Sequence, residues 1–195
     1  MESELHQVLD EKFNLAATLF THPEVRETQR LLDLSNLLLD SFLTGGKIVF
    51  VGNGGSAAEA THLAAEFVGK CLVEHRPLAA ISLADSISTI TAIGNDYGME
   101  FIFERQVQAL VTSKDIVLCL STSGKSQNIL RAIDAANVIG AYTILWMGDF
   151  DNTSTAKDVW KVPSKITPRI QEVHLLWGHL LAEIIEIAPE VRTDS

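Results

Sequence analysis

Residues 47–67, KIVFVGNGGSAAEATHLAAEF, carry the pattern that decides the fold. The apolar, β-branched run 48–51 is typical of a buried strand, and the glycines after it are typical of a tight turn. The Ala-rich segment that follows predicts a helix with Ser56 as its N-cap. A strand, a glycine-rich turn and a helix in this order form the unit from which parallel sheets are built.

The same alternation continues along the rest of the chain. The patterns predict strands at 78–83, 115–120, 142–148 and 158–163, the last of them at an edge of the sheet, and helices at 86–94, 100–111, 126–140 and about 168–187. Two further helices, from 2 to about 22 and from about 24 to 43, precede the first strand. Strands that alternate with helices predict an α/β fold with an open parallel sheet covered on both faces.

The chain has 195 residues, of which 47% are hydrophobic and 21% charged, enough apolar surface for the core of one domain. We expect a single domain over 1–195, made of an N-terminal helical hairpin (1–45) and an α/β core (46–195). The hairpin must bury its apolar stripe, and the same hairpin of another copy is one solution. A homo-oligomer is therefore expected.

Charge and composition exclude several classes of protein. The formal net charge is -10, so most of the surface repels nucleic acid and anionic lipid. The acidic N-terminus is not a secretory signal, and no apolar run is long enough to span a membrane. The two cysteines form no disulfide framework. We expect a cytoplasmic protein that binds neither nucleic acid nor a membrane.

The turn Gly52-Asn53-Gly54-Gly55 is the first candidate site for an anion. Glycines allow backbone N–H groups to approach a ligand closely, and a helix N-terminus adds free donors and a favourable dipole. The turn matches neither GxGxxG nor GxxxxGK[ST], which argues against a dinucleotide site and a P-loop. The competing interpretation is a tight turn closed by a capping serine.

The segment 115–129, DIVLCLSTSGKSQNI, is the second candidate. Four hydroxyl side chains lie between a strand and a helix: Ser121, Thr122, Ser123 and Ser126. Hydroxyls and amides at a helix start suit the oxygens of a phosphate. A serine-rich capping turn is again the competing interpretation. Ligands of such sheets bind at the carboxyl ends of the strands, where both turns are expected.

Two helices carry side chains suited to acid–base chemistry or metal binding. His62 and Glu66 are four residues apart and project from one helix face. Gln171 and His179 lie about 80° apart around the last helix, whereas His174 points elsewhere and is expected in the core or an interface. Imidazole and carboxylate groups suit Zn²⁺, but Glu66 and His179 alone suit metal-free acid–base catalysis. Spacing does not separate these two readings.

Taken together, these motifs resemble the sugar isomerase (SIS) domain family, specifically its phosphoheptose isomerases. The matching segments run in the family's order over most of the chain: 52–67 (GNGGSAAEATHLAAEF), 91–98 (TAIGNDYG), 105–110 (RQVQAL), 120–130 (LSTSGKSQNIL) and 169–179 (RIQEVHLLWGH). The resemblance implies a three-layer, flavodoxin-like sandwich with an N-terminal helical pair, assembled as a homotetramer. The segment 148–158 differs, because it lacks a Gly-Gly pair of the family.

The resemblance also implies a role for individual residues. Glu66 looks like the catalytic base and His179 like the catalytic acid. Four residues match the family's zinc ligands, with one Zn²⁺ per subunit: His62, Glu66, Gln171 and His179. The substrate-binding positions implied are Asn53, Gly54, Gly55, Ser56, Glu66, Asn95, Asp96, Ser121, Thr122, Ser123, Ser126 and Gln171.

The activity implied is an aldose–ketose isomerisation through an enediol. D-sedoheptulose 7-phosphate would give D-glycero-D-manno-heptopyranose 7-phosphate. Two alternatives stay open at this point: an SIS protein without catalytic activity that binds the bacterial replication initiator, and an isomerase for another phosphosugar. The presence of Glu66 and His179 favours the enzyme over the first alternative.

Overall fold

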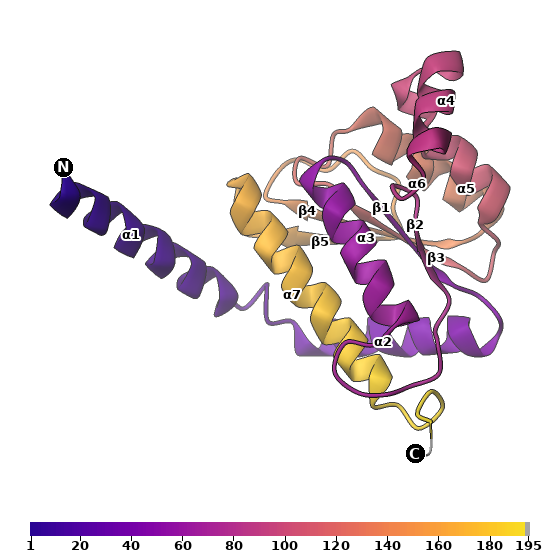
Figure 1. The fold of residues 1–195 in the computed structure, drawn as a ribbon, viewed down its shortest axis with the longest axis horizontal. Coiled ribbons are helices and arrows are strands. Elements are labelled where there is room, and N and C mark those ends of the chain that lie inside the picture. Colours follow the sequence, from indigo (N-terminus) through magenta and orange to yellow (C-terminus); the bar gives the residue numbers. More distant parts are fainter. Residues whose placement is uncertain (194–195) are drawn as a thin grey trace.

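A computed structural model describes residues 1–193, and Figure 1 labels its elements. The helices are α1 (Glu2–Phe20), α2 (Thr28–Leu43), α3 (Gly55–Val68), α4 (Ile87–Tyr97), α5 (Glu104–Leu110), α6 (Gln127–Ile139) and α7 (Thr167–Glu186), with a short 3-10 turn, η1, at Met99–Phe101. The strands are β1 (Ile48–Gly52), β2 (Ala80–Ser82), β3 (Ile116–Leu120), β4 (Tyr142–Gly148) and β5 (Asp158–Val162).

The five strands form one parallel sheet in the order β2-β1-β3-β4-β5. The chain therefore leaves β1 toward one edge of the sheet and leaves β3 toward the other. Ligand crevices of open α/β sheets form at such a reversal of strand order. The predicted parallel sheet, with 158–163 at an edge, is confirmed.

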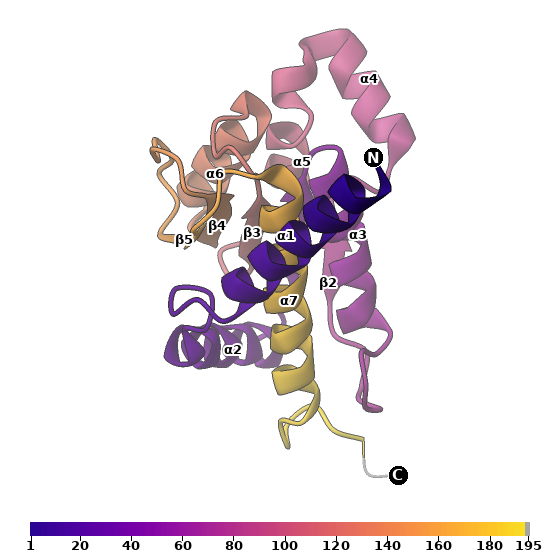
Figure 2. The same ribbon diagram turned by 90° about the vertical axis from the view of Figure 1, so that its left-hand side faces the viewer.

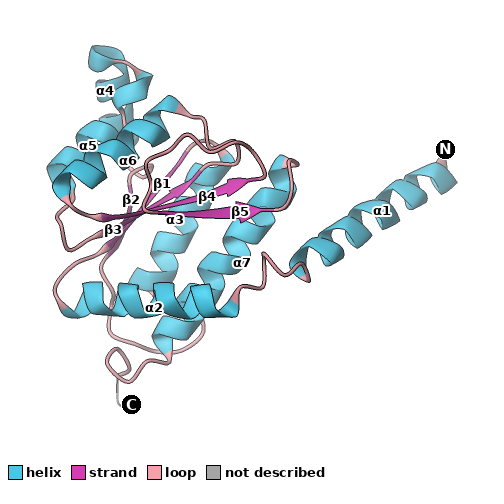
Figure 3. Cartoon of the chain, turned by 180° about the vertical axis from the view of Figure 1, so that it is seen from behind, coloured by secondary structure: helices cyan, strands magenta, loops and turns pink. Residues whose placement is uncertain are grey.

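Helices cover both faces of the sheet, which gives three layers (Figures 1 and 3). Successive side chains of a strand point to opposite faces. Ile48 and Phe50 of β1 accordingly pack with α2, α3 and α7, whereas Val49 and Val51 pack with α5 and α6. Burial on both faces explains why the strands are apolar throughout rather than alternating.

The two N-terminal helices are present, but α1 does not fold back along α2. Helix α2 packs against α7, while α1 projects from the domain (Figures 1 and 2). Apolar side chains of α1 are therefore exposed in the single chain, Leu5 at 60% and Phe13 at 72%. Within residues 1–193, no helix is long and apolar enough to cross a membrane.

Three local expectations differ from the structure. The segment 100–111 is divided between η1 and α5 rather than forming one helix. Asn95 and Asp96 lie within the last turn of α4 instead of after it. Helix α3 begins two residues earlier than expected, with Gly54 rather than Ser56 as its N-cap, because the positive φ of Gly54 (55°) lets the chain turn there. Ser56 is consequently buried in the first turn of the helix.

Candidate active site

The two predicted anion loops lie side by side at the carboxyl ends of neighbouring strands. Gly52 ends β1 and Leu120 ends β3, and these two residues are partners in the sheet register. Each loop leads into a helix, α3 or α6, whose first N–H groups lack intrahelical acceptors. Two helix N-termini and two loops therefore meet at the reversal of strand order, which suits an anionic ligand.

The hydroxyl-rich loop after β3 packs closely against the core of the domain. Gly124 adopts a positive φ of 66°, and a Cβ at this position would clash with Met147. Ser126 caps α6, since its carbonyl oxygen accepts the N–H groups of Ile129 and Leu130 at 3.0 Å. The loop places Ser121, Thr122, Ser123 and Ser126 around one helix start, as the sequence predicts.

A reciprocal amide pair joins the two loops, and sequence reasoning did not identify it. Asn53 Nδ2 donates to Asn128 Oδ1 at 2.9 Å, and Asn128 Nδ2 donates to Asn53 Oδ1 at the same distance. Asn53 follows β1, while Asn128 is the second residue of α6. The sequence signal for Asn128 is its place two residues after the predicted phosphate loop.

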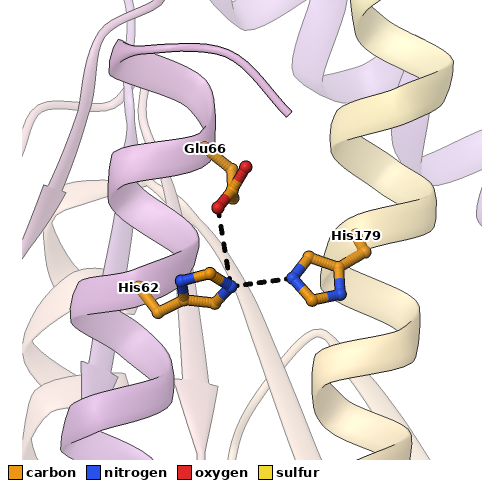
Figure 4. Close-up of side chains that lie close together, drawn as sticks. All are labelled: His62, Glu66 and His179. Carbon is orange, nitrogen blue, oxygen red and sulfur yellow. Dashed lines mark hydrogen bonds and ion pairs between the residues drawn. The ribbon is translucent and has the colours of Figure 1, made fainter. Parts of the chain in front are cut away.

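The structure brings His62, Glu66 and His179 together (Figure 4). The Nε2 atoms of His62 and His179 are 2.8 Å apart, and Glu66 Oε1 lies 3.5 Å from His62 Nε2. The side chain of His62 is 47% exposed and that of Glu66 only 17%. Two imidazoles and a carboxylate from α3 and α7 thus converge where solvent and a ligand have access.

The donor set fits a divalent metal ion. One potential ligand atom from each of the three residues lies within 4.8 Å of the others. Zn²⁺ holds nitrogen and oxygen ligands at about 2.0–2.2 Å, so the ligand atoms around one tetrahedral ion lie about 3.4 Å from each other. Imidazole nitrogen and carboxylate oxygen are also ligand types that Zn²⁺ prefers. A small adjustment of the side chains would complete a three-residue site.

Close packing of α3 on α7 creates this convergence. A Cβ at Gly178 would clash with the side chain of Leu63, so the glycine lets the two helices approach closely. Leu63 and Gly178 are the immediate sequence neighbours of His62 and His179. The contact that sets the helix spacing therefore also sets the distance between the two imidazoles.

Gln171 lies at the other end of the helix pair. Its side-chain amide packs against Gly55, where a Cβ would clash with it. Gly55 and His62 are seven residues apart, about 10 Å along α3 at 1.5 Å per residue. The structure thus places Gln171 beside the first anion loop, and its role as a metal ligand stays a prediction.

Asn95 and Asp96 are predicted substrate contacts that lie on α4 rather than in either anion loop. Both are exposed on α4, where Asn95 Nδ2 donates to Asp96 Oδ1 at 2.8 Å. Helix α4 projects from the domain near the end of the sheet where α3 and α6 begin (Figure 1). Their contact with a sugar also stays a prediction.

Two titratable groups of the same helices are buried in the core. His174 of α7 is fully buried, and burial lowers its pKa to about 3, so the imidazole is neutral at pH 7. This agrees with the expectation that His174 and His179 do not serve one site. Burial also raises the pKa of Glu59, one turn before His62, to about 7. Sequence reasoning did not single out Glu59.

The loop after α3 is anchored by the end of α7. Glu186 accepts the backbone N–H groups of Cys71, Leu72 and Val73, the last two at 2.9 and 3.0 Å. The same loop brings the Cys71 thiol near Glu66. Burial and the Glu66 carboxylate raise the pKa of this thiol to about 11, so it stays protonated at pH 7.

Comparison with known proteins gives consistent matches. The model of the SIS domain matches residues 13–146. The chain is 44% identical over 160 residues to the phosphoheptose isomerase of Aquifex aeolicus, covering 81% of this chain and 84% of that protein. It is 43% identical over 160 residues to that of Rhodospirillum rubrum, covering 81% and 85%.

Solved structures give the same result over longer ranges. The phosphoheptose isomerase of Neisseria gonorrhoeae superposes with a TM-score of 0.81 at 33% identity, covering 93% of this chain and 98% of that one. The phosphoheptose isomerase of Francisella tularensis gives a TM-score of 0.83 at 30% identity, covering 92% and 96%. The similarity therefore extends over the sheet and the helices on both of its faces.

Proposed function

The chain belongs to the SIS domain family and, within it, to the phosphoheptose isomerases, and from this premise we propose that it interconverts D-sedoheptulose 7-phosphate and D-glycero-D-manno-heptopyranose 7-phosphate. The observation that carries the proposal is the convergence of Glu66 and His179 in a chain 44% identical to a phosphoheptose isomerase. A carboxylate beside an imidazole is a suitable pair for moving protons between neighbouring carbons and oxygens.

The arrangement of the site suits a long phosphosugar. The anion loops and the Glu66 group lie at separate places along α3, with His62 about 10 Å from Gly55 along the helix axis. In sedoheptulose 7-phosphate the phosphate on C7 and the reacting carbons C1 and C2 are at opposite ends of the carbon chain. The loops would hold the phosphate through Ser121, Thr122, Ser123 and Ser126, while the carbonyl end extends toward Glu66.

The reaction needs one base that acts on the carbons and one group that donates protons to, and accepts protons from, the oxygens O1 and O2. Glu66 removes a proton from C1, and the electron pair of that C–H bond forms the C1–C2 double bond of the enediol. His179 donates a proton to O2 as the carbonyl opens and accepts one from O1 as the aldehyde forms. Glu66 then returns its proton to C2, so both groups end in their starting protonation states.

We assign one Zn²⁺ per subunit to His62, Glu66 and His179, with the side-chain oxygen of Gln171 as a fourth ligand. When bound, the ion supplies positive charge that polarises the substrate carbonyl and stabilises negative charge developing on oxygen. The donor types and the convergence of His62, Glu66 and His179 support this assignment, whereas Gln171, which packs against Gly55, is included from the resemblance alone. Asn53, Gly54, Gly55, Ser56, Asn95 and Asp96 complete the proposed substrate contacts.

The proposed function is tested by turnover of sedoheptulose 7-phosphate, measured before and after treatment with a chelator. We expect isomerisation in the purified protein, loss of most activity on chelation, and recovery on adding Zn²⁺. Product formation is followed directly by NMR. Absence of turnover in the metal-loaded protein would contradict the function, whereas full activity without metal would contradict only the Zn²⁺ assignment.

The exposed apolar side chains of α1 support a proposal for the assembly of the protein. An apolar groove between α1 and α7 is lined by Leu9, Phe13, Ala16 and Phe20 with Arg169 and Glu172. Exposed apolar surface of this kind is costly in water and marks an interface. We assign it to further copies of the chain in a homotetramer in which 1–45 supplies contacts to the single domain. The two free thiols, Cys71 and Cys119, suit a cytoplasmic location.

Light scattering tests this assembly. The expected mass is about four times the 21.3 kDa of the chain. Phe13, which is 72% exposed in the single chain, is the best position for a disruptive charge, and Phe13→Glu should lower the measured mass at least twofold. Glu24→Gln, in an exposed link outside the groove, is the control. A tetramer that persists in Phe13→Glu would place the contact elsewhere.

A further inference from the structure

The pair formed by Asn53 and Asn128 spans the crevice between β1 and β3. These strands are neighbours, yet the helices that follow them, α3 and α6, cover opposite faces of the sheet. The strand ends are fixed by the ladder, which pairs Gly52 with Leu120. Beyond that last ladder pair, the two loops diverge toward their helices. The amide pair is a side-chain connection that crosses between them.

The chemistry of this pair is specific to two amides. Each side chain donates one N–H to the other and accepts one in return, both at 2.9 Å. A hydroxyl is too short to take the place of either partner, and a carboxylate accepts but does not donate. Each amide also retains a second N–H and further acceptor capacity for a ligand. The pair is therefore a restraint that leaves hydrogen-bonding groups available to the crevice.

The restraint acts on Asn53, which lies between Gly52, the last residue of β1, and Gly54, the N-cap of α3. Gly52, Gly54 and Gly55 surround Asn53, and glycine backbones have the widest conformational range. Asn128 belongs to α6, whose next residue, Ile129, is fully buried. The side chain of Asn128, on the rigid helix α6, thus holds the side chain of Asn53 on the glycine-rich loop. The position of α6 therefore fixes the position of the first loop.

We propose that Asn128 is a positioning residue, which holds Asn53 and the first loop at the spacing from the hydroxyl loop that one phosphosugar requires. This inference rests on the proposed function. Because hydrogen bonds at an exposed site contribute little to net stability, the effect falls on the affinity for the substrate rather than on the fold. Because the pair is remote from Glu66 along α3, we expect the rate of the chemical step to stay unchanged.

The primary experiment compares Asn128→Ala with the wild-type protein on sedoheptulose 7-phosphate. We expect KM to rise about tenfold, the effect of one or two lost hydrogen bonds, while kcat and the bound metal stay within about twofold. Gln127→Ala, which changes the exposed neighbour on the same helix turn, is the matched control and should keep the wild-type KM. An unchanged KM in Asn128→Ala overturns the inference.

A double-mutant cycle tests whether Asn128 acts through Asn53. If it does, Asn53→Ala and Asn53→Ala/Asn128→Ala have the same KM, because Asn53→Ala has already removed the hydrogen bonds through which Asn128 acts. A KM that rises by the full product of the single effects shows that Asn128 acts independently and overturns the positioning role. Should the alanine variants fold poorly, Asn128→Asp keeps the shape and removes the donor, and the same cycle is run with it.

The two proposals fail in different ways. If the wild-type protein does not isomerise sedoheptulose 7-phosphate, the proposed function fails, and the pair is then assessed from the affinity for inorganic phosphate in the same variants. If the wild-type protein is active and Asn128→Ala is indistinguishable from it, only the positioning role fails. The thermal midpoint of each variant, expected within a few degrees of wild type, confirms that the fold is intact.

Discussion

Replacing Glu66 by Gln is expected to lower kcat for sedoheptulose 7-phosphate by about 10²–10⁴-fold, the usual contribution of a well-placed base. Glutamine keeps the size and shape of the side chain but does not accept a proton from carbon. The side chain of Glu66 lies at the partly open junction of α3 and α7, 17% exposed, so the substitution leaves no void in the core. The fold should therefore survive while turnover is lost, as measured by kcat and by the thermal midpoint.

Glu66 has two proposed roles, and the experiment must separate them. The metal content of Glu66→Gln is measured first and restored by adding Zn²⁺ where it is low. A metal-loaded variant that remains inactive supports the role as base, whereas recovery of the wild-type rate would leave Glu66 only as a ligand. Glu24→Gln, an exposed carboxylate in the link between α1 and α2, is the control and should retain full activity. Unchanged turnover in Glu66→Gln itself would refute the mechanism.

The parts of this protein that the sequence predicts are those with local physical causes. An apolar β-branched run at 48–51, followed by glycines, has few alternatives to a buried strand and a tight turn. His62 and Glu66 share a face because four residues make about one helical turn. The two anion loops could be placed at one edge of the sheet because parallel strands all end on the same side.

The parts that were missed depend on residues distant in the chain. Asn53 and Asn128 are 75 residues apart, and Glu186 is 115 residues from Cys71. No periodicity connects such positions, since their contact exists only after the sheet has ordered the strands and α7 has docked on α3. The N-cap of α3 at Gly54 was missed for a smaller reason: a glycine with positive φ competed with a good capping serine.

The network around Glu186 shows what such a distant contact contributes. His75 Nδ1 lies 2.6 Å from the carbonyl oxygen of Arg76, which only accepts, so Nδ1 carries a proton. His75 Nε2 faces Glu186 Oε1 at 3.4 Å, and both side chains are at most 2% exposed. Glu186 thus lies beside the buried His75 ring and accepts three backbone N–H groups of the loop that follows α3.

Glu186→Ala is expected to lower the free energy of unfolding by about 2–4 kcal/mol, because the part-buried N–H groups of Cys71, Leu72 and Val73 lose their acceptor and each such loss costs about 1–3 kcal/mol. This is a large share of the ~5–15 kcal/mol that stabilises a typical domain. The measurement is denaturant unfolding of the variant beside Glu190→Ala, which removes an exposed carboxylate nearby and should change stability by less than about 0.5 kcal/mol.

The effect should also reach the candidate metal site. Glu186 ties the loop after α3 to the end of α7, two turns beyond His179, so it limits how far the two helices slide past each other. If Glu186→Ala is stable enough to purify, we expect weaker Zn²⁺ binding in addition to the lower stability. A variant with unfolding behaviour like that of Glu190→Ala would show that the loop is held by its other contacts, such as Arg76 N–H to the Val191 carbonyl at 2.9 Å. Helix spacing would then rest on the direct packing of α3 against α7, including Leu63 against Gly178, and the imidazoles would converge without help from the buried carboxylate.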